Sequence, residues 1–192
     1  MADWRLREGS PADVPAAMEL IRLSPWLTCH TEHTYWILFN HGRRYVVVAE
    51  TPEGETIGFS SGLRSTRDPE LLFVWQLVVA PAYRGGHLAW ELLTTLIDDV
   101  AGADGCTYVE AAMDAENEPL MRSLQGWVEN TDRAWGPRER ITYETPDPDG
   151  THRTVSEVIF VFRRRGDPLA AELGSGPEDW NLEGLPEGDG SA

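Results

Sequence analysis

The feature that most constrains this chain is a tight turn between an apolar, strand-like run and an apolar-rich segment with helical spacing. The run covers Leu71–Val79 and is followed by Pro81, Arg84, Gly85 and Gly86. A strand that leads through glycines directly into a helix leaves backbone N–H groups without partners, and these donors form an anion site with the helix dipole. The turn therefore predicts a phosphate-binding loop, although glycine before a helix also occurs in plain connections.

Two common phosphate-binding loops do not fit this turn. A Walker loop requires Gly-Lys-Ser/Thr, and the chain contains no lysine among its 192 residues. A dinucleotide fingerprint requires Gly-x-Gly-x-x-Gly in an early strand–helix–strand unit, whereas this turn lies mid-chain, after an antiparallel hairpin, with different spacing. The order of elements along the chain is therefore the better guide to the fold.

Local sequence patterns predict this order of elements. Ser10 and Pro11 form a helix start, with a hydroxyl cap and a proline in the first turn. The sequence TPEGE, residues 51–55, is typical of a hairpin turn. Much later in the chain, Gly126 is expected to end the helix that precedes this glycine. We predict strands over 4–7, 44–50, 56–63, 71–79, 106–113, 140–144 and 155–163, and helices over 10–24, 35–39, 85–100 and 117–125, with a loop over 25–33.

The net charge of −16 and the absence of lysine limit the classes of function. Such a charge repels nucleic-acid phosphates and argues against a general DNA- or RNA-binding surface, while it suits a cationic substrate and serves solubility equally well. A chain without lysine has no lysine nucleophile or Schiff base. Two cysteines are too few for a disulfide framework, and no segment resembles a signal peptide or a membrane span. We expect a soluble, cytoplasmic protein.

The composition changes after Arg165, and we take residues 1–165 as one domain. Residues 166–192 are rich in Gly, Pro, Asp and Glu, contain no basic residue, and have the composition of a disordered segment. Several leucines and Trp180 interrupt this polar sequence. Two interpretations stay open: a solvated acidic tail, or a segment that docks on its own domain or on a neighbouring subunit.

The sequence LVVAPAYRGGHLAWELL and the element order together resemble the GNAT acyltransferase superfamily over roughly residues 3–164. In the family pattern Gln/Arg-x-x-Gly-x-Gly/Ala, Arg84 matches the first position and Ala89 the last, while His87 replaces the middle glycine. The resemblance implies an α+β (mixed α/β) fold, with a mixed, mostly antiparallel sheet of about seven strands and about four helices. It also implies acetyl-CoA as the acyl donor. The implied cofactor-binding residues are Leu77, Val78, Val79, Arg84, Gly85, Gly86, His87, Leu88, Ala89 and Asn117.

A closer resemblance is to the ectoine-pathway diaminobutyrate acetyltransferases. These share a Phe-Val-Trp-Gln strand before the turn and a closing strand with a glutamate, which implies acceptor-binding roles for Trp75 and Glu157. Their substrate loop is not shared: Thr28 stands where the family has an aspartate and His33 where it has a tyrosine, whereas Tyr35 is kept. We therefore expect Trp75, Tyr35, Thr28 and Glu157 to contact an acceptor related to diaminobutyrate, while Trp75 as plain core stays an alternative.

Transfer of an acyl group to an amine requires a group that removes the proton of the ammonium, and three residues are candidates. Glu157 lies in an apolar strand, which raises a carboxyl pKa, and it can act as the base or only hold the substrate ammonium. His33 is a second candidate because imidazole titrates near neutrality, or else it is an ordinary loop residue. Glu110 is a third, on the strand expected beside the cofactor. We predict no metal site, because His30 and His33 have no third ligand.

We therefore predict an acetyl-CoA-dependent N-acetyltransferase that acetylates a small amino-acid-like amine by direct transfer. Within the same chemistry, the donor can be a longer acyl-CoA, or the acceptor a peptide or protein N-terminus. The alternative from another class is a binding module in which His87 has impaired the cofactor site. The family resemblance also suggests a homodimer.

Overall fold

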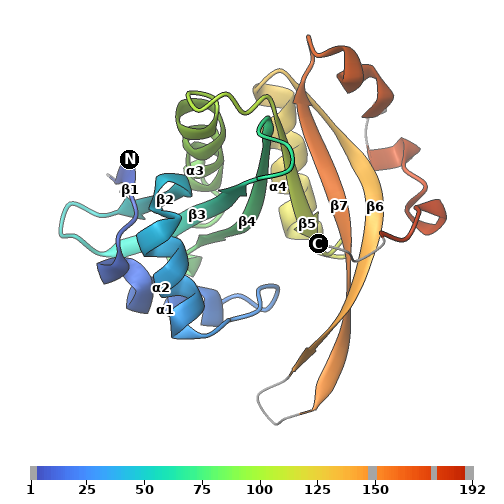
Figure 1. Cartoon of the computed structure of the whole chain (residues 1–192). Helices are drawn as coiled ribbons and strands as arrows, with labels where there is room; N and C mark the ends of the chain where they lie inside the picture. Colours follow the sequence, from blue (N-terminus) through green and yellow to red (C-terminus); the bar gives the residue numbers. More distant parts are fainter. Residues whose placement is uncertain (1–3, 147–150, 174–176, 189–192) are drawn as a thin grey trace. The chain divides into compact units, whose positions relative to one another are not determined.

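The computed structural model of the chain describes residues 4–146, 151–173 and 177–188 (Figure 1). It divides into two compact units, residues 1–107 and residues 108–192, which are described in turn. Over the described residues, the two units together contain seven strands and four α-helices. None of the helices in these stretches is both long and apolar enough to cross a membrane.

The first unit is built on four antiparallel strands in the order β1-β2-β3-β4. The predicted hairpin between the second and third strands is confirmed. The Gly54 N–H donates to the Thr51 carbonyl at 2.9 Å, and Gly54 has a φ of +88°, which glycine adopts without strain. The strands are β1 (Arg5–Glu8), β2 (Val46–Glu50), β3 (Thr56–Arg64) and β4 (Leu71–Val79).

Helices α1 (Val14–Arg22) and α2 (Glu32–His41) both begin at capped turns. The helix start predicted at Ser10 is confirmed, because the Asp13 carboxylate accepts a hydrogen bond from the Ser10 N–H at 2.8 Å ahead of α1. The Thr31 hydroxyl accepts from the N–H of Thr34 at 3.3 Å and caps α2. This cap makes α2 longer than the predicted 35–39.

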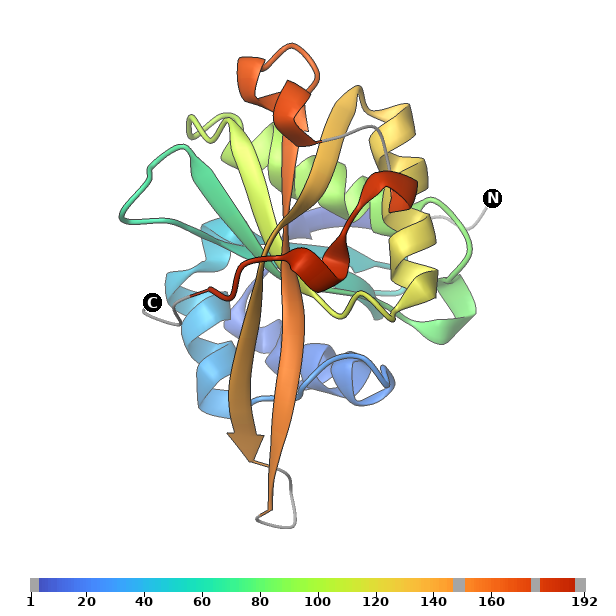
Figure 2. The same cartoon turned by 90° about the vertical axis from the view of Figure 1, so that its right-hand side faces the viewer.

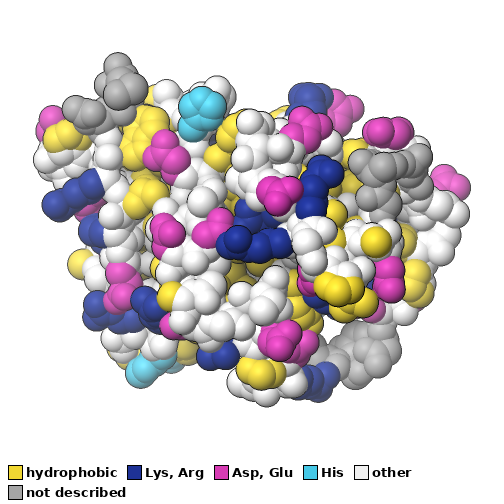
Figure 3. Space-filling view, turned by 90° about the horizontal axis from the view of Figure 1, so that it is seen from above, with side chains coloured by type: hydrophobic (Ala, Val, Ile, Leu, Met, Phe, Trp, Pro, Cys, Tyr) yellow, Lys and Arg dark blue, Asp and Glu magenta, His cyan; other side chains and the backbone are white. Residues whose placement is uncertain are grey.

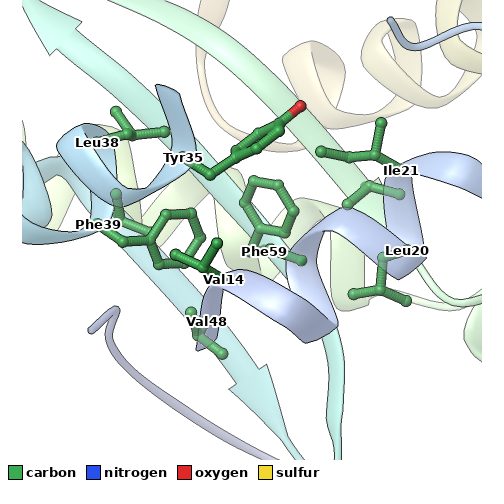
Figure 4. Close-up of a cluster of buried hydrophobic side chains, with 11 residues drawn as sticks. Val14, Leu20, Ile21, Tyr35, Leu38, Phe39, Val48 and Phe59 are labelled. Carbon is green, nitrogen blue, oxygen red and sulfur yellow. The ribbon is translucent and has the colours of Figure 1, made fainter. Parts of the chain in front are cut away.

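The two helices pack on one face of the sheet and form a hydrophobic cluster with it (Figure 4). Val14 and Ile21 come from α1, Tyr35 and Phe39 from α2, and Phe59 from β3. All five are at most 3% exposed. The Tyr35 hydroxyl lies at the margin of this cluster, where polar partners can reach it (Figure 4).

Helix α3 (Leu88–Thr94) packs on the opposite face and continues as a π-helical segment over Thr95–Ala101. The Ser60 hydroxyl of β3 donates to the carbonyl of Leu92 at 3.0 Å, which ties this helix to the sheet. The helix begins at Leu88 rather than at the predicted residue 85. The difference arises because Gly85 has a φ of +78°, a left-handed conformation that an α-helix does not contain.

The second unit contains a three-stranded antiparallel sheet in the order β5-β7-β6. Its elements are β5 (Tyr108–Met113), α4 (Glu118–Asn130), β6 (Arg133–Pro146) and β7 (His152–Arg164). The predicted end of the helix at Gly126 is wrong, because α4 runs on to bury Trp127 against Phe162 with a ring-centroid distance of 5.9 Å. Burial of this large ring outweighs the cost of about 1 kcal/mol for a glycine inside a helix.

Strands β6 and β7 are also longer than predicted, and β6 begins well before residue 140. The sequence Gly136-Pro137 in β6 is typical of a loop. In the structure this proline lies where the register of β6 against β7 shifts, so that the ladder tolerates its missing N–H. The sequence TPDPDG between these two strands, residues 145–150, is typical of a turn, and its residues 147–150 lie outside the described part of the chain.

The described part of the acidic C-terminal segment packs on its own unit, beside β6 and β7 (Figures 1 and 2). The Trp180 ring contacts Trp135 and Phe160, with centroid distances of 4.7 and 5.2 Å. The backbone of Arg140 receives a hydrogen bond from Gly188 at 2.7 Å and donates one to Pro186 at 2.9 Å. The segment thus covers the free edge of β6 over this stretch.

Charged side chains of both signs are mixed on the face shown in Figure 3. Arginine and carboxylate side chains alternate over this face, so the negative charge does not gather there in one patch (Figure 3). Several arginines of the described part of the chain pair with carboxylates, for example Arg44 with Asp104 at 3.0 Å and Arg122 with Glu118 at 3.0 Å.

Candidate active site

The turn between β4 and α3 offers backbone donors to an anion. The N–H groups of His87, Leu88 and Ala89 make no hydrogen bond within the described part of the chain. A Cβ at Gly85 would meet no atom within 4 Å, so glycine is required there by its φ of +78° and not by crowding. Free N–H groups in an open turn are suited to an anion, and the diphosphate site at this turn stays a prediction.

Two side chains of this turn, those of Arg84 and His87, contact neighbouring parts of the first unit. The Arg84 guanidinium donates from Nε to the Val79 carbonyl at 2.9 Å and so bridges the turn back to β4. The His87 side chain is exposed, and its ring lies edge-on to Trp90 with a centroid distance of 5.3 Å. The imidazole therefore rests against α3 itself.

A β-bulge displaces Trp75 from the regular alternation of β4. Ser61 pairs with Gln76 and the next residue, Gly62, pairs with Val74, so that Trp75 is the extra residue in the bulge. The Trp75 ring stacks on Tyr35 with a centroid distance of 5.9 Å and lies 5.1 Å from the His30 ring. The bulge thus brings a strand tryptophan against the predicted substrate loop.

Gln76 connects this loop to the sheet. Its Nε2 donates to the Thr28 carbonyl at 3.2 Å and to the Tyr35 hydroxyl at 3.3 Å. The His30 N–H also donates to the Tyr35 hydroxyl, at 3.3 Å. Burial raises the pKa of Tyr35, against the opposing effect of these two donors, so the phenol is neutral. Thr28 therefore enters this network through its backbone carbonyl.

The two histidines of the loop have different surroundings. His33 is exposed in the first turn of α2, edge-on to Trp36 with a centroid distance of 6.2 Å. His30 lies against Trp75, and partial burial lowers its pKa, which favours the neutral imidazole. His33 thus stays a predicted base, but the structure brings His30, not His33, to Trp75 and Tyr35.

The second unit contains a carboxylate and phenol pair of its own. The Tyr143 hydroxyl of β6 donates to Glu157 Oε2 of β7 at 3.0 Å. Burial raises the pKa of Glu157, the hydrogen bond from Tyr143 lowers it in part, and the charge of Asp114 raises it further. Burial and the charge of Glu157 raise the pKa of Tyr143 to about 12. Tyr143 therefore donates to a carboxylate that accepts a proton more readily than a free one.

Glu110 and Asn117 are both buried and both already have partners. The Glu110 carboxylate pairs with the Arg138 guanidinium. The Asn117 side chain caps α4 by accepting from the N–H of Leu120 at 3.2 Å. Glu110 as base and Asn117 as a cofactor contact stay predictions, and these contacts give each of them a structural role as well.

Three residues of these clusters were absent from the sequence-based set of site residues: His30, Gln76 and Tyr143. A single glutamine inside an apolar strand was the available signal for Gln76, because a buried amide needs polar partners. Tyr143 had no such signal, since its position opposite Glu157 depends on the register of the hairpin.

Comparison with known proteins identifies the family. The family model described as Acetyltransferase (GNAT) family matches residues 12–125. The L-2,4-diaminobutyric acid acetyltransferase of Streptomyces coelicolor is 28% identical over 171 residues, which cover 88% of this chain and 96% of that protein. The enzyme of the same name from Virgibacillus pantothenticus is 30% identical over 120 residues, 62% of this chain and 74% of that protein.

Solved structures agree with this assignment. The diaminobutyrate acetyltransferase EctA from Paenibacillus lautus, in complex with L-2,4-diaminobutyric acid and coenzyme A, superposes with a TM-score of 0.71 at 28% identity. The superposition covers 86% of this chain and 97% of that structure. Chaetomium thermophilum Naa20 also reaches a TM-score of 0.71, at 16% identity, which supports the fold alone. The predicted α+β fold and the family resemblance are confirmed, and the chain belongs to the GNAT acetyltransferase family.

Proposed function

We propose that this chain is an acetyl-CoA-dependent N-acetyltransferase whose acceptor is a small diamino acid, L-2,4-diaminobutyrate or a close analogue. The observation that carries the proposal is the likeness, over 97% of its length, to a diaminobutyrate acetyltransferase bound to its diamino acid and to coenzyme A. Changes in the loop over 25–33, chiefly Thr28 and His33, are the reason to include analogues. Their side chains differ in charge and size from those of the resembling family.

The turn after β4 is proposed to hold the coenzyme, which supplies an activated thioester when bound. The N–H groups of His87, Leu88 and Ala89 would bind its diphosphate, and the left-handed Gly85 keeps side-chain atoms away from them. The His87 ring, which rests on Trp90, leaves these donors available. Arg84 contributes by fixing the turn through its bond to Val79.

Glu157 is proposed to receive the acceptor ammonium and take up its proton. An alkylammonium has a pKa of about 10, so it must lose a proton before its nitrogen can attack the thioester carbon. That proton passes to the carboxylate first, and the neutral amine can then attack; as the N–C bond forms and the C–S bond breaks, the second proton of the nitrogen goes to the released thiolate or to water. The raised pKa of Glu157, caused by burial and by Asp114, makes it a better proton acceptor than an exposed glutamate.

Trp75 and Tyr35 are proposed to shape the acceptor side of the first unit. The bulge turns the indole onto the Tyr35 ring, and Gln76 fixes the phenol and the loop backbone at Thr28. A rigid aromatic wall favours a small acceptor over a long flexible peptide.

The test is an acceptor screen with purified full-length protein, scored by release of free thiol and by the mass of the product. We expect acetylation of L-2,4-diaminobutyrate or another short diamino acid, and loss of at least about 100-fold in kcat/KM in Glu157→Gln. Glu144→Gln, an exposed glutamate of the same hairpin, is the matched control and should keep normal activity. Binding of acetyl-CoA without acetylation of any diamino acid would refute the proposed acceptor class.

A further inference from the structure

The buried carboxylates of this protein are neutralised by arginine. Asp13, Glu50 and Glu110 are each at most 6% exposed. Asp13 and Glu50 pair with Arg7, and Glu110 pairs with Arg138. A buried carboxylate without a cationic partner is costly, so this pairing is the expected arrangement.

Glu157 departs from this arrangement. It is half-buried, and among the described residues its carboxylate accepts a single hydrogen bond, from the neutral Tyr143 hydroxyl, and has no arginine within ion-pair distance. The bond goes to Oε2, which leaves Oε1 without a partner in the described part of the chain. One carboxylate oxygen is thus anchored and the other is available.

The register of the β6–β7 hairpin creates this contact. Glu157 pairs with Ile141 and Tyr143 pairs with Val155, so the two polar side chains are diagonal neighbours on the same face. The O–H···O distance of 3.0 Å is at the long end of the usual range for a hydroxyl donor. The backbone of two paired strands thus fixes both members of the pair.

The charged groups around the pair are few. Asp114 follows Met113, which pairs with Val158, so Asp114 lies beside Glu157 at the end of β5. Its negative charge disfavours ionisation of Glu157, as burial does. Arg153 on β7 acts on Tyr143, whose pKa it lowers against burial and the charge of Glu157. Of these groups, Tyr143 is the one that stabilises the ionised form of Glu157.

We propose that Tyr143 is a positioning residue for the reaction, because its hydroxyl orients Glu157 and keeps it ionised so that Oε1 can receive the acceptor ammonium. This inference rests on the proposed function. In the proton-transfer step, one proton moves from the acceptor nitrogen to Oε1 and Tyr143 keeps its own proton. The phenol is thus a fixed donor that does not itself exchange a proton.

The experiment is the pH dependence of kcat/KM for L-2,4-diaminobutyrate in the wild type and in Tyr143→Phe. Removing the hydroxyl takes away a hydrogen bond to the charged form, so we expect the pKa of Glu157 to rise. The acidic limb of the profile should move to higher pH by about half a unit to one unit, a modest value because Tyr143 is partly exposed. Above the limb, kcat/KM should fall less than about tenfold.

Two further variants separate this role from a structural one. Tyr45→Phe is the matched control, since the Tyr45 hydroxyl also donates to a carboxylate, Asp104, at 3.0 Å, and it should leave the acidic limb in place. In a Glu157→Gln background, Tyr143→Phe should change kcat/KM by less than about twofold, because the two residues act as one unit.

A binding measurement provides a readout without turnover. L-2,4-diaminobutyrate is titrated calorimetrically into protein saturated with coenzyme A at a series of pH values. As the pH is lowered, binding should weaken in both proteins, and the weakening should begin at a higher pH in Tyr143→Phe than in the wild type. If the wild type acetylates diamino acids but Tyr143→Phe shifts neither the acidic limb nor the pH dependence of binding, the role of Tyr143 is overturned and the proposed function is not. A wild type that acetylates no diamino acid overturns the proposed function and this inference with it.

Discussion

Replacing Gln76 with leucine tests whether this buried amide holds the acceptor loop to the sheet. Gln76 is 4% exposed, and its Nε2 donates to the Thr28 carbonyl and to the Tyr35 hydroxyl. Leucine has a similar volume but no donor, so the substitution removes both hydrogen bonds with little change in packing. We expect lower stability and a loop that binds the acceptor less well.

The magnitude follows from the geometry of the two hydrogen bonds. Their lengths of 3.2 and 3.3 Å are long for N–H···O contacts, which places each near the lower end of about 0.5–1.5 kcal/mol. Loss of one partner of a buried hydrogen bond adds a desolvation cost. Removal of Gln76 Oε1 offsets part of this cost, because this buried oxygen has no hydrogen-bond partner among the described residues. We expect a net loss of about 1–2 kcal/mol, or roughly 2–8 °C in Tm.

The assay is a double-mutant cycle on the free energy of unfolding, with Gln76→Leu, Tyr35→Phe and the double variant. If the amide and the phenol interact as the structure shows, the cycle should give a coupling energy of about 0.5–1.5 kcal/mol. The acceptor KM should rise in Gln76→Leu while the Kd for acetyl-CoA stays constant. If the stability cost of the double variant equals the sum of the two single costs within about 0.3 kcal/mol, the interaction between Gln76 and Tyr35 is refuted.

Three further substitutions have outcomes set by burial and charge. Arg7→Gln should cost about 2–4 kcal/mol at neutral pH, because it leaves Asp13 buried without its bidentate partner. Burial alone would raise the pKa of Asp13, but the hydrogen bonds and charge of Arg7 together with the hydrogen bonds from Ser10 lower it overall. The stability that depends on Arg7 is therefore present above the ordinary value of 3.8, and the two proteins should converge as the pH falls below it. Trp180→Ala should cost about 2–4 kcal/mol in denaturant unfolding, whereas the exposed Leu169→Ala control should cost less than about 0.5 kcal/mol. Glu157→Gln should raise stability at neutral pH, since a carboxyl with a raised pKa in the folded state destabilises that state as the pH rises, and the gain should vanish in acid.

The elements that the sequence predicted well depend on local chemistry. Ser10 with its following proline, and Gly54 in its hairpin, act through a cap and through a left-handed backbone conformation, both of which are properties of a few adjacent residues. The elements it missed depend on distant partners. Gly126 stays inside α4 because Trp127 packs on a strand more than thirty positions later in the sequence, and β6 extends through a proline because β7 pairs with it.

The same distinction holds for the site. Residue type and spacing were enough to predict the glycine turn, whereas Trp75, Tyr35 and Glu157 were predicted from the resemblance to the diaminobutyrate acetyltransferases. The bulge that turns Trp75 onto Tyr35 depends on the register of β3 against β4, and no local pattern encodes that register.

The surroundings of Glu157 are better explained by function than by stability. In a chain of net charge −16, another half-buried carboxylate beside Asp114 opposes folding, and an arginine partner, as at Glu110, would remove that cost. A guanidinium there would also stabilise the ionised carboxylate strongly and make it a poor proton acceptor. A phenol of high pKa orients the carboxylate with a weaker effect on its proton affinity. The absence of an arginine at Glu157 within the described residues is therefore what a proton-accepting carboxylate requires.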